Sequence, residues 1–118
     1  MSPVTDPWPW PDEMDGPIAA GENHRVLFEN DRVRVLETVI RPGEITPVHT
    51  HRPATVMYVV SGTSFIRRDD RGAVMLDTSR ISPPFVMPPV LWSESVPAHT
   101  IENTSPDDLL VIGVELKT

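Results

Sequence analysis

Three of the four histidines in this 118-residue chain have a spacing that suits a metal site. His49 and His51 are separated by one residue, and in an extended strand the side chains at positions i and i+2 point to the same face. Two imidazoles placed in this way can both reach one ion at the ~2.0–2.1 Å of a metal–nitrogen bond. If the fold brings His99 beside them, the chain forms a cup of three nitrogen ligands.

The composition restricts the class of protein that could carry such a site. The length indicates one domain. The net charge of −7, from seventeen acidic and ten basic residues, argues against a nucleic-acid partner, which would need a basic surface. No apolar run approaches the roughly 18 residues of a membrane span, so we expect no membrane partner. The absence of cysteine excludes disulfides, thiolate nucleophiles and cysteine-ligated metal sites. The start of the chain lacks a basic stretch followed by an apolar one, so we expect a cytoplasmic protein.

The elements that must position the histidines are predicted to be short β-strands. Fourteen prolines, about twice the usual share, disfavour helices and long central strands. No segment shows a 3.6-residue apolar period, and runs rich in β-branched residues alternate with turn residues, which is typical of a sandwich or barrel. The nearly continuous apolar run 55–60 predicts a strand covered on both faces. The expected strands are residues 32–40, 55–60, 63–68, 73–76, 99–102 and 109–116, with further strand-like sequence from residue 24 onward.

Residues 1–20 differ in composition from the rest and are predicted to form an N-terminal arm outside the barrel domain of residues 21–118. Prolines recur through residues 3–17, with Trp8 and Trp10 among them, which favours an extended or polyproline-like conformation without a helix. The sequence leaves three alternatives open: a disordered tail, an arm that docks on its own barrel, and an arm that docks on a neighbouring subunit.

The segment from Gly43 to Gly62 resembles the first conserved motif of the cupin superfamily, G-x5-H-x-H-x(3–4)-E-x6-G. His49 and His51 occupy the two histidine positions of that motif. Thr55 stands where the family has a glutamate.

The second cupin motif, P-x-G-x2-H-x3-N, is matched at its end by His99 and Asn103. Glu94 and Val96 replace its proline and glycine. The resemblance implies an all-β fold, a small double-stranded β-helix or jelly-roll barrel. It also implies that His49, His51 and His99 point into the barrel and bind a divalent metal such as iron, manganese, nickel or zinc. Because small cupins often pair through their outer sheets, it further implies a homodimer.

A small-molecule pocket is expected around these imidazoles. Strand parity places Thr55, Met57 and Val59 on one face, and it places Ile101 on the same face as His99. Trp92 is a candidate either for the pocket wall or for the core. Such a mostly apolar pocket with few polar groups suits a small organic ligand.

The missing glutamate leaves the chemistry of the site open. Three imidazoles leave the +2 charge of a divalent ion uncompensated, which favours an anionic ligand, but the loss of an anionic ligand could also leave the metal weakly bound or absent. Glu37 is a possible substitute ligand, although a strand glutamate more often faces solvent. We interpret His24 as a surface histidine and residues 67–71 as a solvated hairpin tip.

The leading functional hypothesis is a metal-dependent cupin enzyme of the dioxygenase, isomerase or lyase type, acting on a small anionic organic substrate. No general base is evident in the sequence. The alternative is a non-catalytic cupin that binds or senses a small ligand in the same pocket. A third hypothesis is a domain for assembly, whose arm joins subunits.

Overall fold

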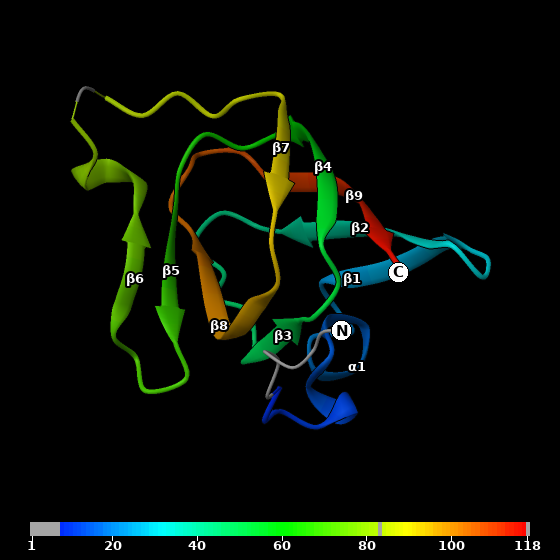
Figure 1. Ribbon diagram of the computed structural model, residues 1–118. Helices are drawn as coiled ribbons and strands as arrows, with labels where there is room; N and C mark the ends of the chain where they lie inside the picture. Colours follow the sequence, from blue (N-terminus) through cyan, green and yellow to red (C-terminus); the bar gives the residue numbers. More distant parts are fainter. Residues whose placement is uncertain (1–7, 83, 118) are drawn as a thin grey trace.

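The computed structural model describes residues 8–82 and 84–117 and contains two antiparallel β-sheets that face each other (Figure 1). The order of strands is β1-β2-β9-β4-β7 in the five-stranded sheet and β3-β8-β5-β6 in the four-stranded sheet. The strands are β1 (His24–Glu29), β2 (Val33–Ile40), β3 (His49–His51), β4 (Thr55–Ser61), β5 (Phe65–Asp69), β6 (Val74–Asp77), β7 (Val90–Ser93), β8 (Val96–Asn103) and β9 (Leu109–Leu116).

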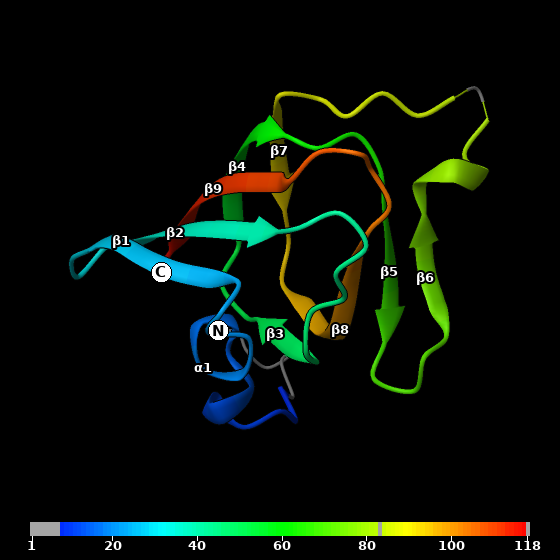
Figure 2. The same cartoon turned by 180° about the vertical axis from the view of Figure 1, so that it is seen from behind.

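The chain passes repeatedly from one sheet to the other, which closes the two sheets into a barrel. From β3 onward only β5 and β6 are consecutive strands of the same sheet. Seen from behind in Figure 2, β9 and β2 run side by side across one wall, while β5 and β6 form the other. This is the architecture of a jelly roll, so the predicted all-β, double-stranded β-helix barrel is confirmed.

The core lies between the inner faces of the two sheets. Leu36, Ile40 and Leu109 are buried on the five-stranded side, and Val96 and Ala98 are buried on β8. Each large aliphatic side chain buried in this way contributes roughly 1.5–3 kcal/mol relative to exposure. The packing is close at the turn after β4. A Cβ added at Gly62, whose φ is +104°, would lie 2.6 Å from the Leu109 Cδ1 atom, so only glycine fits there.

Most predicted strands agree with the structure to within a few residues, but two strands were missed. β3 has only three residues, and β7 follows the proline-rich stretch that hid its pattern. The expectation that both faces of residues 55–60 are covered is wrong for this chain, because Val56, Tyr58 and Val60 are exposed. Only the inner face of β4 packs on the core; the outer side chains alternate with the inner ones.

The N-terminal arm, described here from Trp8, contains two helical turns that were not expected. A 3₁₀ helix, η1, spans Asp12–Met14, and a single α-helical turn, α1, spans Gly16–Ala19. The prolines permit this because Pro11 precedes η1 and Pro17 lies in the first turn of α1, where no intrahelical N–H donor is needed. Residues 1–7 of the predicted arm lie outside the described part of the chain.

From Trp8 onward the arm packs on its own barrel. The backbone of Asp15 forms a parallel bridge with Thr50 of β3, and the Arg52 guanidinium lies 5.6 Å from the centroid of the Trp8 ring. Figure 1 shows this segment below β3 and β1. Among the described helices, none is long and apolar enough to cross a membrane.

Candidate metal centre

The fold brings all four histidines of the chain into one cluster. β3 supplies His49 and His51, and β8 supplies His99, which is the cross-strand partner of His49. The ring centroids are 4.8 Å apart for His49 and His51, 4.3 Å for His49 and His99, and 5.5 Å for His51 and His99. The three histidines singled out in the sequence therefore do lie together, although His99 comes 48 residues after His51 along the chain.

The fourth member of the cluster is His24, and its interpretation as a surface histidine is wrong. Its side chain is 5% exposed, and its ring centroid lies 4.8 Å from that of His49 and 5.0 Å from that of His51. The donor atoms of His24, His49 and His51 lie within 4.8 Å of one another. His24 is the only buried residue of β1, because the strand begins under the arm and then runs out along the edge of the sheet.

Three of the four rings are held by the same kind of hydrogen bond. The Nδ1 atoms of His24, His49 and His99 lie 3.0, 2.8 and 2.7 Å from the backbone carbonyl oxygens of Ala20, Pro47 and Pro97. A carbonyl oxygen can only accept, so Nδ1 must carry the proton in each ring. The Nε2 atom of each neutral ring then keeps its lone pair. A backbone carbonyl on the opposite nitrogen is the arrangement that orients metal-ligating histidines in proteins.

His24, His49 and His99 are neutral at pH 7 because their rings are buried. Burial and the neighbouring His51 lower the pKa of His24 to about 4. Burial and the neighbouring His99 lower the pKa of His49 to about 2, and burial with His51 lowers the pKa of His99 to about 3. Protonation would place like charges side by side in a poorly solvated site, so the neutral, metal-binding form is favoured.

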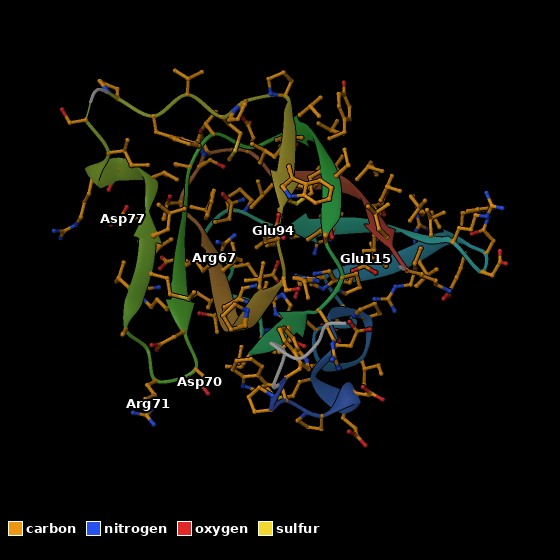
Figure 3. The ribbon with its side chains drawn as sticks, in the orientation of Figure 1. Arg67, Asp70, Arg71, Asp77, Glu94 and Glu115 are labelled. Carbon is orange, nitrogen blue, oxygen red and sulfur yellow. The ribbon has the colours of Figure 1, made fainter. Side chains whose placement is uncertain are left out.

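A buried carboxylate, Glu115, stands next to this cluster and was missed in the sequence. Glu115 on β9 is the cross-strand partner of Thr55, so the carboxylate lies opposite the position where the cupin motif has its glutamate. Its side chain is 2% exposed; one oxygen lies 2.6 Å from Arg34 Nε and the other 3.8 Å from His51 Nδ1. Figure 3 labels Glu115 on the five-stranded side of the barrel.

Glu115 is ionised in this environment. Burial alone would raise the pKa of its carboxyl group, but the neighbouring His51 ring and the hydrogen bond from Arg34 outweigh the burial and lower the pKa. The carboxylate therefore faces the one ring whose Nδ1 is not held by a backbone carbonyl. A sequence signal existed: Glu115 is the one acidic residue of an otherwise apolar strand, on the same face as Val111 and Gly113.

The other candidate carboxylate, Glu37, lies on the outside of the barrel. Its neighbours Leu36 and Thr38 line the interior, so strand parity turns Glu37 outward. There it pairs with Arg25 at 3.1 Å.

The histidines and Glu115 lie at one end of a mostly apolar cavity of about 140 Å³. Thr55, Met57, Val59 and Ile101 line this cavity, as strand parity suggested. The prediction that Trp92 forms part of the pocket wall or packs in the core is wrong. Trp92 is 54% exposed on the outer face of β7, while its neighbours Leu91 and Ser93 face inward.

The arm packs against the histidine cluster. Arg34 links the arm to Glu115. Its Nη1 and Nη2 atoms lie 2.9 and 3.2 Å from the carboxylate oxygens of Asp15 in the arm, and its Nε atom contacts Glu115. Gly16 is buried against His51: an added Cβ would lie 2.7 Å from the His51 Cε1 atom and 3.4 Å from the His24 Cδ2 atom. The orientation of His51 therefore depends on a glycine in the arm.

We expect the substitution Gly16→Ala to displace His51. Overpacking of this kind typically destabilises a protein by about 1–3 kcal/mol. It should also weaken metal binding, as loss of a histidine-orienting contact does, by about 10–100-fold. Urea unfolding and metal titration measure the two effects. Ile18→Ala, on the same helical turn but with an exposed side chain, is the matched control and should change neither.

The donor set fits a divalent transition metal. Imidazole nitrogen is a preferred ligand for zinc, iron and nickel, and an adjacent carboxylate compensates part of the ionic charge. Two nitrogens on one ion at 2.0–2.1 Å are roughly 3.3 Å apart, so donor atoms that lie within 4.8 Å of one another would approach by up to about 1.5 Å on binding. The buried group His24, His49 and His51 could therefore hold a metal ion.

A closed jelly roll of this topology is the architecture of the cupin fold. Comparison with solved structures supports this fold. A cupin domain from Bordetella pertussis Tohama I superimposes with a TM-score of 0.59 at 18% identity, covering 80% of this chain and 92% of that one.

Two further structures give the same result. An RmlC-like cupin family protein with a double-stranded β-helix fold from Methanocaldococcus jannaschii has a TM-score of 0.55 at 14% identity, covering 79% of this chain and 77% of that chain. A double-stranded β-helix protein from Klebsiella pneumoniae has a TM-score of 0.53 at 18% identity, covering 80% and 75%. No protein-family model and no curated protein matches the sequence. At these identities the likeness shows the fold: this chain has the cupin fold.

Proposed function

We propose that this protein is a metal-dependent cupin enzyme acting on a small anionic organic substrate. The observation that carries the proposal is the common tautomer of the buried rings: His24, His49 and His99 each donate Nδ1–H to a backbone carbonyl and leave Nε2 free. Hydrogen bonding that fixes histidines in this way is typical of metal ligands.

The cluster His24, His49, His51 and His99 would hold iron, manganese, nickel or zinc. The bound ion would supply Lewis-acid polarisation of a substrate oxygen. Glu115 compensates part of the positive charge and orients His51, while Arg34 and Asp15 hold Glu115 in place. The apolar walls at Met57 and Val59 keep water from the bound substrate, which strengthens electrostatic interactions inside the cavity.

A second candidate function is non-catalytic binding or sensing of the same kind of ligand. It is supported by the state of Glu115, the one carboxylate among the described residues that line the cavity. Because Arg34 and His51 already engage it, Glu115 is not free to act as a general base. Turnover of a bound ligand by metal-loaded protein would favour the enzyme, and release of unchanged ligand would favour the sensor.

We also propose that the protein forms a homodimer in the cytoplasm. The exposed outer face of the five-stranded sheet carries large apolar side chains that a second copy could cover: Val56, Tyr58, Val60, Val90 and Trp92. Contiguous exposed apolar surface of this kind often marks an interface.

Titration of metal-stripped protein tests the proposed function. Isothermal calorimetry with Zn²⁺, Fe²⁺, Mn²⁺ and Ni²⁺ at pH 7.5 should show one saturable site per chain, with no proton released by His24, His49 or His99, whose rings are already neutral. Absence of saturable binding of all four ions at millimolar concentration would refute the metal-dependent function.

A further inference from the structure

The side chain of Arg67 faces the cavity, which corrects its assignment to a solvated hairpin tip. Arg67 on β5 lines the cavity together with Phe65, while the neighbouring Arg68 points to the other face and pairs with Glu102 at 2.8 Å. The hairpin tip itself begins at Asp69, whose side chain accepts hydrogen bonds from the backbone N–H groups of Arg71 and Ala73. Figure 3 shows Asp70 and Arg71 at this tip, well away from Arg67.

The guanidinium of Arg67 lacks an anionic partner within the described part of the chain. Its Nε atom is buried without a hydrogen-bond partner, and no ion pair joins Arg67 to a described acidic residue. Its neighbour in the cavity is the ring of Phe65, whose centroid lies 5.9 Å from the guanidinium carbon. Arg34 and Arg68, by contrast, are each paired with carboxylates.

A partly buried cation without an anionic partner is costly unless something else neutralises it. Arginine stays charged at neutral pH, so the group cannot escape this cost by losing its proton, although burial lowers its pKa. Such a group facing a cavity is therefore a natural site for an anion. Its planar fork of N–H donors matches the two oxygens of a carboxylate.

The position of Arg67 relative to the histidines limits the size and polarity of a ligand that could fill the cavity. Arg67 is the cross-strand partner of Ile101, and His99 lies two residues before Ile101 in β8, on the same inner face. The positive charge of Arg67 contributes to lowering the pKa of His99, in keeping with this proximity. The cavity is lined mostly by apolar side chains, and its volume of about 140 Å³ is close to the roughly 150 Å³ of a cavity that holds benzene.

We propose that Arg67 binds the carboxylate of a small acid whose apolar body, about the size of one ring, fills the cavity toward the histidine cluster. This inference rests on the proposed function for the far end of the ligand, since the metal would take a second oxygen there. The anion site at Arg67 nevertheless stands on its own contacts and can be tested without metal.

The test is binding of benzoate, with benzamide as its neutral counterpart, to metal-free and Zn²⁺-loaded full-length protein by calorimetry. Benzoate should bind metal-free protein and benzamide should bind at least tenfold more weakly. Arg67→Met keeps the apolar stem and removes the charge, so it should weaken benzoate binding by about 10–100-fold. Arg67→Lys keeps the charge but lacks the planar fork of N–H donors, so its affinity for benzoate should lie between those of wild type and Arg67→Met.

Arg68→Met is the matched control, because this neighbour is paired with Glu102 on the other face, and it should leave benzoate affinity unchanged. Arg67→Met should keep the wild-type affinity for Zn²⁺ and should not lower the melting temperature. Equal affinity of wild type and Arg67→Met for benzoate, or no binding of benzoate by wild type at millimolar concentration, would overturn the inference.

The two proposals fail in different ways. Zinc binding without Arg67-dependent carboxylate binding would defeat only the anion site. Arg67-dependent benzoate binding by a protein that takes up no metal would defeat the proposed function and leave the anion site standing.

Discussion

Metal-free protein should lose much of its free energy of unfolding as the pH falls from about 6.5 to about 5. The cause is the buried histidine cluster, since the pKa values of His24, His49 and His99 in the folded protein are about 4, 2 and 3. In the unfolded chain they return to about 6.5. Between these limits the unfolded state binds protons that the folded state does not, so acid favours unfolding.

The expected loss is comparable to the whole stability of a small domain. A difference of one bound proton changes the free energy of unfolding by about 1.4 kcal/mol per pH unit, so each ring contributes at most about 2 kcal/mol between pH 6.5 and 5. Three rings together give at most about 6 kcal/mol, against a typical total of 5–15 kcal/mol. Above about pH 6.5 this contribution to stability is present in full.

Urea unfolding of metal-free protein at pH 7.5, 6.0 and 5.0 measures this dependence. Glu115 also has a lowered pKa, but its contribution to stability is lost only when the pH falls below the ordinary pKa of glutamate. It therefore does not affect the measurement between pH 6.5 and 5. A single substitution, His24→Gln, removes one of the three titrating rings. It should reduce the change in the free energy of unfolding per pH unit by about a third. A free energy of unfolding that stays constant down to pH 5 would contradict the buried, neutral cluster.

The parts of the site that follow local rules could be predicted from the sequence. The i, i+2 spacing of His49 and His51 and the parity of Thr55, Met57 and Val59 need only the geometry of one strand. The position of His99 could not be predicted from the geometry of one strand. His99 comes 48 residues after His51, so only a motif or the fold can place it beside the other two rings.

The residues that were missed are those whose position depends on how distant segments pair. Glu115 is near the cluster because β9 aligns it with Thr55, and no local pattern of β9 fixes that register. His24 is buried because the arm covers the first residue of β1, and the proline content of the arm gave no sign of helical turns there. Arg67 faces inward while Arg68 faces outward, and a one-residue shift in β5 would have exchanged them.

The substitution His49→Ala should abolish tight metal binding. His49 is the central ring of the cluster, with its centroid 4.8 Å from those of His24 and His51 and 4.3 Å from that of His99. Loss of a contact that only orients a ligand costs about 10–100-fold in metal affinity, so loss of the central ligand should cost more than 100-fold. Calorimetric titration with Zn²⁺ and elemental analysis of the purified variant measure the effect.

Asn103→Ala separates loss of a ligand from loss of stability. Asn103 is as buried as His49, and its side chain bonds the backbone of Ile40, Asp107 and Ser105, but it does not belong to the histidine cluster. This control should lower the melting temperature and keep the Zn²⁺ affinity of the folded protein. His49→Ala should lose Zn²⁺ affinity instead. It should also make the free energy of unfolding less dependent on pH, because the ring with the most strongly lowered pKa is gone. Wild-type Zn²⁺ affinity in His49→Ala would mean that the four rings meet for packing and that any metal binds elsewhere.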